Sequence, residues 1–167
     1  ILYRLVGSEM CIRDRSLMVV DSLLQDIKYA DLTNIKIQEA KGRFEIVNDS
    51  PIKIIDGAHN YEGVEILLRN YENKYGHLNT DLFVGFKKGK DINNIFNLII
   101  GKTNYNLHLI EDDTFFDQEI TKEIGYLLDK HGKNYKISSL EQFNRNKNPS
   151  ILLGSLYLIG EYKKRNI

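Results

Sequence analysis

The sequence is poor in features that would point to several classes of protein. It has a single cysteine, Cys11, so it cannot form an internal disulfide, which fits a reducing compartment. Its 23 basic residues balance its 23 acidic residues, and this zero net charge gives no electrostatic attraction to nucleic acid or to an anionic membrane. Its longest apolar runs, such as 151–153, are far too short to span a bilayer. We therefore expect no nucleic-acid partner and no membrane partner.

The sequence also lacks a metal-binding motif. A structural or catalytic metal site needs closely spaced cysteine, histidine or carboxylate ligands. The four histidines are instead scattered along the chain, at His59, His77, His108 and His131. We expect this chain to supply no metal ligand.

The 167 residues allow one domain with a substantial core and a piece of a second. The first segment, ILYRLVGSEMCIRDR at 1–15, mixes arginine with apolar residues without a helical or strand period, and it does not read as a signal peptide. We predict that it is a non-native leader with few packing contacts; the alternative is a native helix cut off from its context. Residues 16–28 have helical periodicity, with Ser16 as a plausible N-cap.

Strand and helix patterns alternate from residue 44 onward. Strands are predicted at 44–47, 52–55, 81–86, 106–110, 135–138 and 151–153. Helices are predicted at 61–75, 91–100, 116–130 and 155–164, the last with Leu156, Ile159 and Gly160 packing, and 140–143 is a short turn or helix. Strands separated by helices of this length predict an α/β fold, with a Rossmann-like, mostly parallel six-stranded sheet and helices on both faces.

The stretch IKIIDGAHNYEG, at 52–63, places polar residues at the exit of a buried strand. Ligands bind beyond the carboxyl ends of strands in open α/β sheets, so Asp56 is a candidate acceptor for hydroxyl groups there. Gly57 lets the chain turn, and His59 and Asn60 lie in the loop before the next helix. The alternative is structural: Asp-Gly is a common turn dipeptide, Asn60 could be an N-cap, and a lone His59 could be solvated.

Two further segments resemble phosphate sites only weakly. VGFKKGKD, at 84–91, has glycines and lysines after a strand but lacks the spacing of a P-loop. Gly154-Ser155 follows the last strand and offers a hydroxyl at a helix N-terminus, although taken by itself this pattern is more often an ordinary serine N-cap. Because the carboxyl ends of parallel strands face one way, we expect Ser155 to lie near His59.

Three blocks together resemble the C-terminal domain of folylpolyglutamate synthase/dihydrofolate synthase, in the Mur ligase superfamily. They are GRFEIV at 42–47, PIKIIDGAHNYEGVE at 51–65 and LLGSLYLIGE at 152–161. The resemblance covers roughly residues 35–165. It implies that 16–34 is the tail of the family's central ATPase domain with its linker, and that 35–167 is the Mur ligase C-terminal domain.

The resemblance implies a parent enzyme that is an ATP-dependent amide ligase of folate biosynthesis and polyglutamylation. ATP phosphorylates a carboxylate of dihydropteroate or folate, and the amino group of L-glutamate attacks the acyl phosphate. The Mg²⁺ ligands and the phosphate-cradling loop belong to the family's N-terminal part. The C-terminal domain closes over the nucleotide. We expect a cytoplasmic, monomeric parent, and no ligase turnover from this fragment alone.

The resemblance also assigns roles to individual positions. Arg43 matches an arginine that reaches the ATP phosphates, and Asp56 matches a carboxylate near the ribose. His59 and Ser155 match positions that handle glutamate. The sequence departs from the family pattern at Ala40-Lys41, where Trp-Pro is usual, and at Tyr61, where proline is usual. These departures leave the expected fold intact and bear on loop geometry near Arg43 and His59.

Two other interpretations compete with this one. A peptide ligase of the cell-wall Mur branch shares the expected fold, but DGAHN stands where that branch has a lysine-bearing loop. A stand-alone α/β binding module without catalysis is the interpretation from a different class.

Overall fold

The computed structural model describes residues 41–87, 91–111 and 118–165. The predicted leader at 1–15, the helix and linker at 16–34 and the domain boundary at 35 lie outside these described residues. The same holds for Ala40 and for 88–90 of the VGFKKGKD segment.

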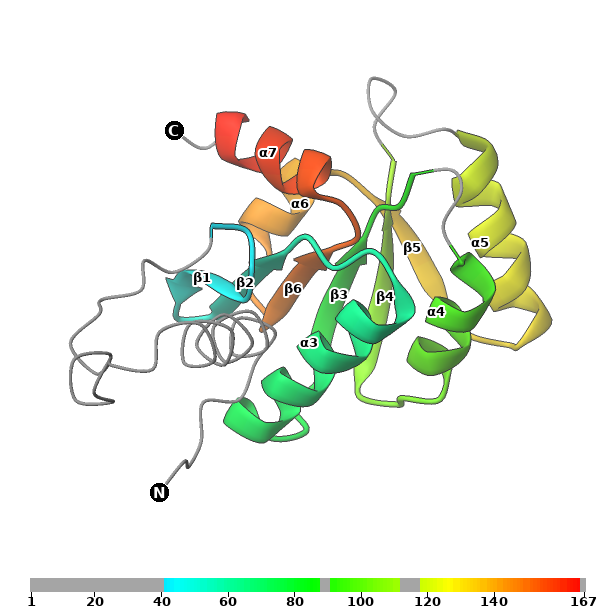
Figure 1. Cartoon of the computed structure of the whole chain (residues 1–167), viewed down its shortest axis with the longest axis horizontal. Helices are drawn as coiled ribbons and strands as arrows, with labels where there is room; N and C mark the ends of the chain where they lie inside the picture. The colour runs from blue at the N-terminus through cyan, green and yellow to red at the C-terminus, as the bar shows by residue number, and fades with distance from the viewer. Residues whose placement is uncertain (1–40, 88–90, 112–117, 166–167) are drawn as a thin grey trace, which may run out of the picture.

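A six-stranded sheet forms the centre of the described chain, in the order β1-β2-β6-β3-β4-β5 (Figure 1). The strands are β1 (Glu45–Asp49), β2 (Ile52–Asp56), β3 (Thr80–Val84), β4 (Tyr105–Ile110), β5 (Tyr135–Ser138) and β6 (Ser150–Leu153). Only β1 runs antiparallel, to β2, because the turn between them is too short for a parallel crossover. The predicted mostly parallel six-stranded sheet is confirmed.

Helices cover both faces of the sheet, as predicted (Figure 1). One core lies beneath α3 (Tyr61–Tyr75), α4 (Ile92–Ile100) and α5 (Gln118–Lys130). A second, smaller core lies beneath α6 (Leu140–Arg145) and α7 (Leu156–Arg165). Consecutive residues of β2 divide between the two, with Ile54 in the first and Ile55 in the second.

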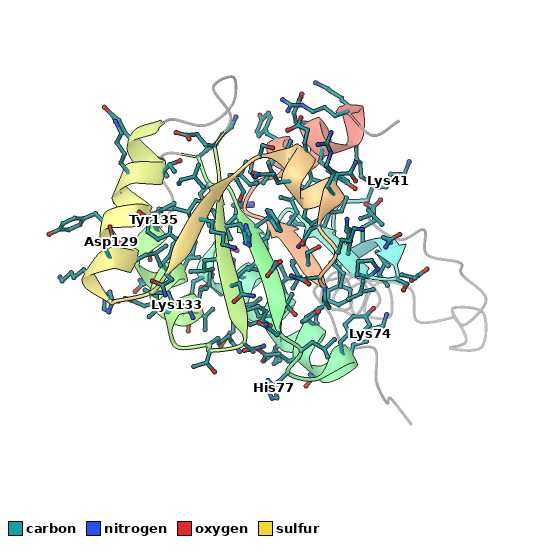
Figure 2. All side chains as sticks on the ribbon, turned by 180° about the vertical axis from the view of Figure 1, so that it is seen from behind. Lys41, Lys74, His77, Asp129, Lys133 and Tyr135 are labelled. Atoms are coloured by element: carbon teal, nitrogen blue, oxygen red, sulfur yellow. The ribbon has the colours of Figure 1, made fainter. Side chains whose placement is uncertain are left out.

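The central strands β3 and β6 are buried along their whole length, which explains the apolar runs at 82–84 and 151–153. The edge strands β1 and β5 are mostly half-buried or exposed. Tyr135 of β5 packs toward α5 (Figure 2), where Gly125 makes room: an added Cβ there would lie 2.6 Å from the Tyr135 hydroxyl.

The boundaries of α3 match the prediction. The side chain of Asn60 accepts from the Gly63 N–H as the N-cap, and Gly76 ends the helix with a φ of 73°. The predicted packing of α7 was right for two of its three residues. Ile159 is buried, and Leu156 packs on Gly57 although it is 49% exposed. The prediction was wrong for Gly160, which has open space where a Cβ would stand; the other buried residues of this helix are Leu158 and Tyr162.

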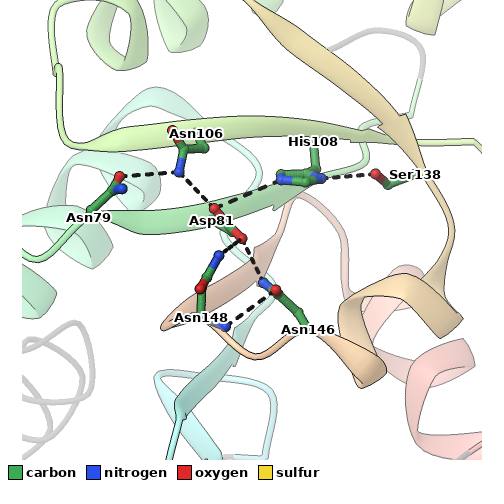
Figure 3. A network of polar contacts seen from close by, with 7 residues as sticks. All are labelled: Asn79, Asp81, Asn106, His108, Ser138, Asn146 and Asn148. Atoms are coloured by element: carbon green, nitrogen blue, oxygen red, sulfur yellow. Dashed lines mark hydrogen bonds and ion pairs between the residues drawn. The ribbon is translucent and has the colours of Figure 1, made fainter.

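The amino ends of the parallel strands are joined by a buried carboxylate, Asp81, the second residue of β3 (Figure 3). It accepts hydrogen bonds from the amides of Asn106, Asn146 and Asn148 at 2.8, 2.9 and 3.0 Å. These donors outweigh burial and hold the pKa of Asp81 below its usual value. The network therefore connects β3 to β4 and to the segment before β6.

No helix in the described ranges is long and apolar enough to cross a membrane. Among those same residues, no group of three or more histidine, cysteine, aspartate or glutamate side chains could hold a metal ion.

Candidate functional site

Three neighbouring strand exits meet at the carboxyl edge of the sheet. Asp56 at the end of β2 and Val84 at the end of β3 both pair with Leu153 of β6. The chain after β6 passes close to the chain after β3, since a Cβ on Gly154 would lie 2.3 Å from the Gly85 carbonyl oxygen. Gly154 has a φ of 124°, so it meets both the spatial and the conformational demands of this crossing. The polar residues that follow these strands therefore share one edge.

The turn after β2 packs directly on the start of α7. A Cβ on Gly57 would lie 2.3 Å from a terminal carbon of the Leu156 side chain. The backbone of Gly57 is not left-handed, so glycine at this turn serves close packing against the Leu156 side chain and not an unusual turn conformation.

Asp56 is 4% exposed and forms hydrogen bonds to its own surroundings. Its Oδ1 accepts from the Ala58 N–H at 2.7 Å and its Oδ2 from the Phe44 N–H at 2.8 Å. Burial raises the pKa of Asp56, and the two backbone donors and the nearby Arg43 only partly oppose this. These contacts support the turn-forming interpretation of Asp56. Its predicted contact with a ribose stays a prediction.

Arg43 lies beside this carboxylate, with Nη1 at 3.6 Å from Oδ1 of Asp56 and 35% of its side chain exposed. Its backbone neighbours have left-handed conformations: φ is 75° at Gly42 and 44° at Phe44. A left-handed φ is unfavourable for phenylalanine, so the surrounding contacts must hold it. One of them is the 2.8 Å hydrogen bond from the Gly57 N–H to the Gly42 carbonyl. The structure therefore brings Arg43 and Asp56 together and directs a partly exposed guanidinium to the site.

His59 is half-buried, and its Nδ1 lies 2.8 Å from the Gly57 carbonyl oxygen. A carbonyl only accepts, so Nδ1 carries the proton. In the neutral ring, Nε2 is then left as an acceptor.

Ser155 is 7% exposed and acts as the N-cap of α7, because its Oγ accepts from the Tyr157 N–H at 3.2 Å. The structural alternative for Ser155 therefore holds. Its hydroxyl proton is still able to donate to another group. Ser155 and His59 follow adjacent parallel strands, and the packing of Gly57 on Leu156 joins their two loops.

The sequence did not point to two other contacts at this edge. Lys87, after β3, places its ammonium 3.6 Å from the ring centre of Tyr157 on α7. Lys163, also on α7, forms an ion pair of 2.6 Å with Glu45 of β1. Neither pair has a local sequence signal, because its members come from distant parts of the chain.

The fold of this chain is found in solved folylpolyglutamate synthases. The enzyme from Thermotoga maritima matches with a TM-score of 0.64 and 21% identity, over 89% of this chain and 36% of its own. The Mycobacterium tuberculosis enzyme, complexed with ADP and AMPPCP, matches with a TM-score of 0.71 and 12% identity, over 97% of this chain and 40% of its own. The bifunctional folylpolyglutamate synthase/dihydrofolate synthase from Yersinia pestis, complexed with AMPPNP and a Mn ion, matches with a TM-score of 0.57 and 17% identity, over 82% of this chain and 36% of its own.

A search of protein-family models and of curated protein sequences finds no match. At 12–21% identity the structural matches establish the fold, and the chain spans 36–40% of the length of the three enzymes. The described domain has the six-stranded α/β fold expected from the Mur ligase C-terminal domain.

Proposed function

We propose that this chain is the C-terminal part of an ATP-dependent ligase that adds L-glutamate to dihydropteroate or folate through an acyl phosphate. The observation that carries the proposal is the position of Arg43: a partly exposed guanidinium, held 3.6 Å from a buried carboxylate at a strand exit. The shared fold with folylpolyglutamate synthases, some solved with nucleotides, adds independent support.

Arg43 is the proposed ligand for the ATP phosphates. A guanidinium presents several N–H donors in a fixed plane that suits phosphate oxygens. Charge builds up on the transferring phosphoryl group in the transition state, so a pre-positioned cation there lowers the barrier. Asp56, with both oxygens bonded within the protein, would act by holding Arg43 and its loop, and any bond to the ribose would be additional.

The proposed glutamate contacts are His59 and Ser155. With Nδ1 committed to the Gly57 carbonyl, Nε2 of His59 can accept a hydrogen bond from the amino group of glutamate. The Ser155 hydroxyl, at the N-terminus of α7, can donate to a carboxylate.

Within the described ranges, no group of three or more acidic, histidine or cysteine side chains gathers around a point that could hold Mg²⁺. Its ligands are expected in the rest of the parent enzyme, where the metal would neutralise phosphate charge. We also propose that the chain alone has no ligase turnover, that the parent acts as a cytoplasmic monomer, and that its partners are ATP, L-glutamate and a pterin or folate substrate.

Steady-state kinetics of the parent enzyme test the role of Arg43. Arg43→Ala should reduce kcat by ~10²-fold or more, as expected for loss of a pre-positioned charge. Arg69→Ala, an exposed arginine of α3, is the matched control and should retain normal kinetics. Unchanged kcat and unchanged KM for ATP in Arg43→Ala would refute the nucleotide-site proposal.

A further inference from the structure

The loop that carries Arg43 is held from two sides. On one side it hydrogen-bonds to the turn after β2, through Gly42 with Gly57 and through Phe44 with Asp56. On the other side it packs on α7, where a Cβ on Gly42 would lie 3.3 Å from a methyl group of Ile159. Arg43 therefore lies between the strand exit and the helix that begins beside Ser155.

A single carboxylate oxygen joins this loop to α7. Oε2 of Glu45 accepts from the Gly42 N–H at 2.5 Å and from the Lys163 ammonium at 2.6 Å. Burial alone would raise the pKa of Glu45, but these two donors lower it overall, so the carboxylate is ionised at neutral pH. Lys163 thus fixes Glu45, and Glu45 fixes the residue that immediately precedes Arg43.

We propose that Glu45 and Lys163 are positioning residues for Arg43, which hold its strained loop in the geometry that binds a polyphosphate. This inference rests on the proposed function of Arg43 as a phosphate ligand. Phe44 has a left-handed backbone, which is unfavourable for a residue with a Cβ, so the loop conformation needs external support. The Glu45–Lys163 pair provides it next to Gly42, and Asp56 provides it at Phe44.

The pair is suited to positioning more than to global stability. Both side chains are 27% exposed, and ion pairs that solvent reaches contribute little to the free energy of unfolding. Its removal should therefore loosen the loop while the domain stays folded. Lys164 is the matched control, because it is adjacent to Lys163, is 76% exposed and pairs only weakly with Glu161 of the same helix.

The experiment is an NMR titration of the 167-residue chain with inorganic tripolyphosphate. NMR is chosen because it also measures weak affinities. Lys163→Met should weaken binding by roughly 3–10-fold, as expected when a pre-organised contact becomes disordered, and Lys164→Met should bind like wild type. Lys163→Arg keeps the positive charge and should retain most of the wild-type affinity for tripolyphosphate. Equal losses in Lys163→Met and Lys164→Met would mean that only net charge matters and would overturn the proposal.

Glu45→Ala separates positioning from simple electrostatics. This change removes a negative charge, so general attraction would tighten binding of an anion, whereas lost positioning weakens it. Weaker binding supports the proposal, and equal or tighter binding overturns it. In an Arg43→Met background, Lys163→Met should have no further effect, because residues that act as a unit are not additive.

A second measurement separates this inference from the proposed function. The Nε–H order parameter of Arg43, from ¹⁵N relaxation without ligand, should fall in Lys163→Met and not in Lys164→Met. If wild type binds no tripolyphosphate but this fall is seen, the phosphate role of Arg43 fails while the positioning contact stands. If the order parameter is the same in wild type, Lys163→Met and Lys164→Met, the positioning proposal is wrong.

Discussion

Arg43 lies 3.6 Å from Asp56, and the two residues differ sharply in exposure: 35% of the arginine side chain is accessible but only 6% of the aspartate side chain. The carboxylate is part of the protein interior, and the guanidinium is the part that a ligand can reach. The two residues should therefore behave differently when they are replaced.

Asp56→Ala is expected to destabilise the domain by about 2–3 kcal/mol, because it leaves the buried Ala58 N–H and the half-buried Phe44 N–H without an acceptor. Arg43→Ala should change stability by less than about 1 kcal/mol, as expected for a partly exposed ion pair. Urea unfolding followed by circular dichroism measures both values. Similar losses in the two variants would contradict this division of roles.

Ser155→Ala in the parent enzyme should raise the KM for glutamate more than the KM for ATP. The variant also loses a helix cap, which costs about 1 kcal/mol. Ser139→Ala is the matched control, since Ser139 is also a serine N-cap, of α6, whose side chain accepts from the Gln142 N–H. The control should show a similar loss of stability with normal kinetics. A larger effect of Ser155→Ala on the KM for ATP would move Ser155 out of the glutamate site.

Gly154→Ala should destabilise the domain by at least about 2 kcal/mol, because its φ of 124° is strained for alanine and the new Cβ would meet the Gly85 carbonyl. Gly160→Ala, within α7, has open space around the new Cβ and should be neutral or stabilising by up to about 1 kcal/mol. Thermal unfolding of both variants checks the contrast. A Gly154→Ala variant as stable as wild type would disprove the tight crossing of the β3 and β6 exits.

His108 should make stability dependent on pH below neutrality. Its ring stacks on Phe83 at 4.3 Å and contacts the Ser138 hydroxyl at 2.9 Å. Burial lowers the pKa of His108, although Asp81 opposes this shift; Lys136 adds to the lowering. The unfolded chain then binds more protons once the pH falls below about 6.5, so acidification favours unfolding, by at most about 1.4 kcal/mol per pH unit.

Urea unfolding at about pH 7.5 and about pH 5.5, on either side of the unperturbed histidine pKa, tests this expectation. His108→Gln should reduce the difference in stability between the two pH values. The control His131→Gln replaces an exposed histidine and should leave that difference unchanged. The prediction fails if His108→Gln shows the same pH dependence as wild type.

Local patterns in the sequence were enough to predict the class of fold. Continuous apolar runs identified the buried strands β3 and β6, and the spacing of Val64, Leu67, Leu68 and Tyr71 identified the inward face of α3. The polar segment after β2 was located from a local pattern too. The apolar run ends at Asp56, so the polar residues that follow it were expected at the carboxyl edge of the sheet. Such periodicities depend only on residues that are close in the chain.

The tertiary structure alone decided what the site residues contact. The strand order brings β6 between β2 and β3, which places α7 against both the turn at Gly57 and the loop of Arg43. It also joins Glu45 to Lys163, although β1 and α7 lie at opposite ends of the described chain. Long-range pairs of this kind have no local period, because their partners are chosen by how the elements pack and not by their spacing in the sequence.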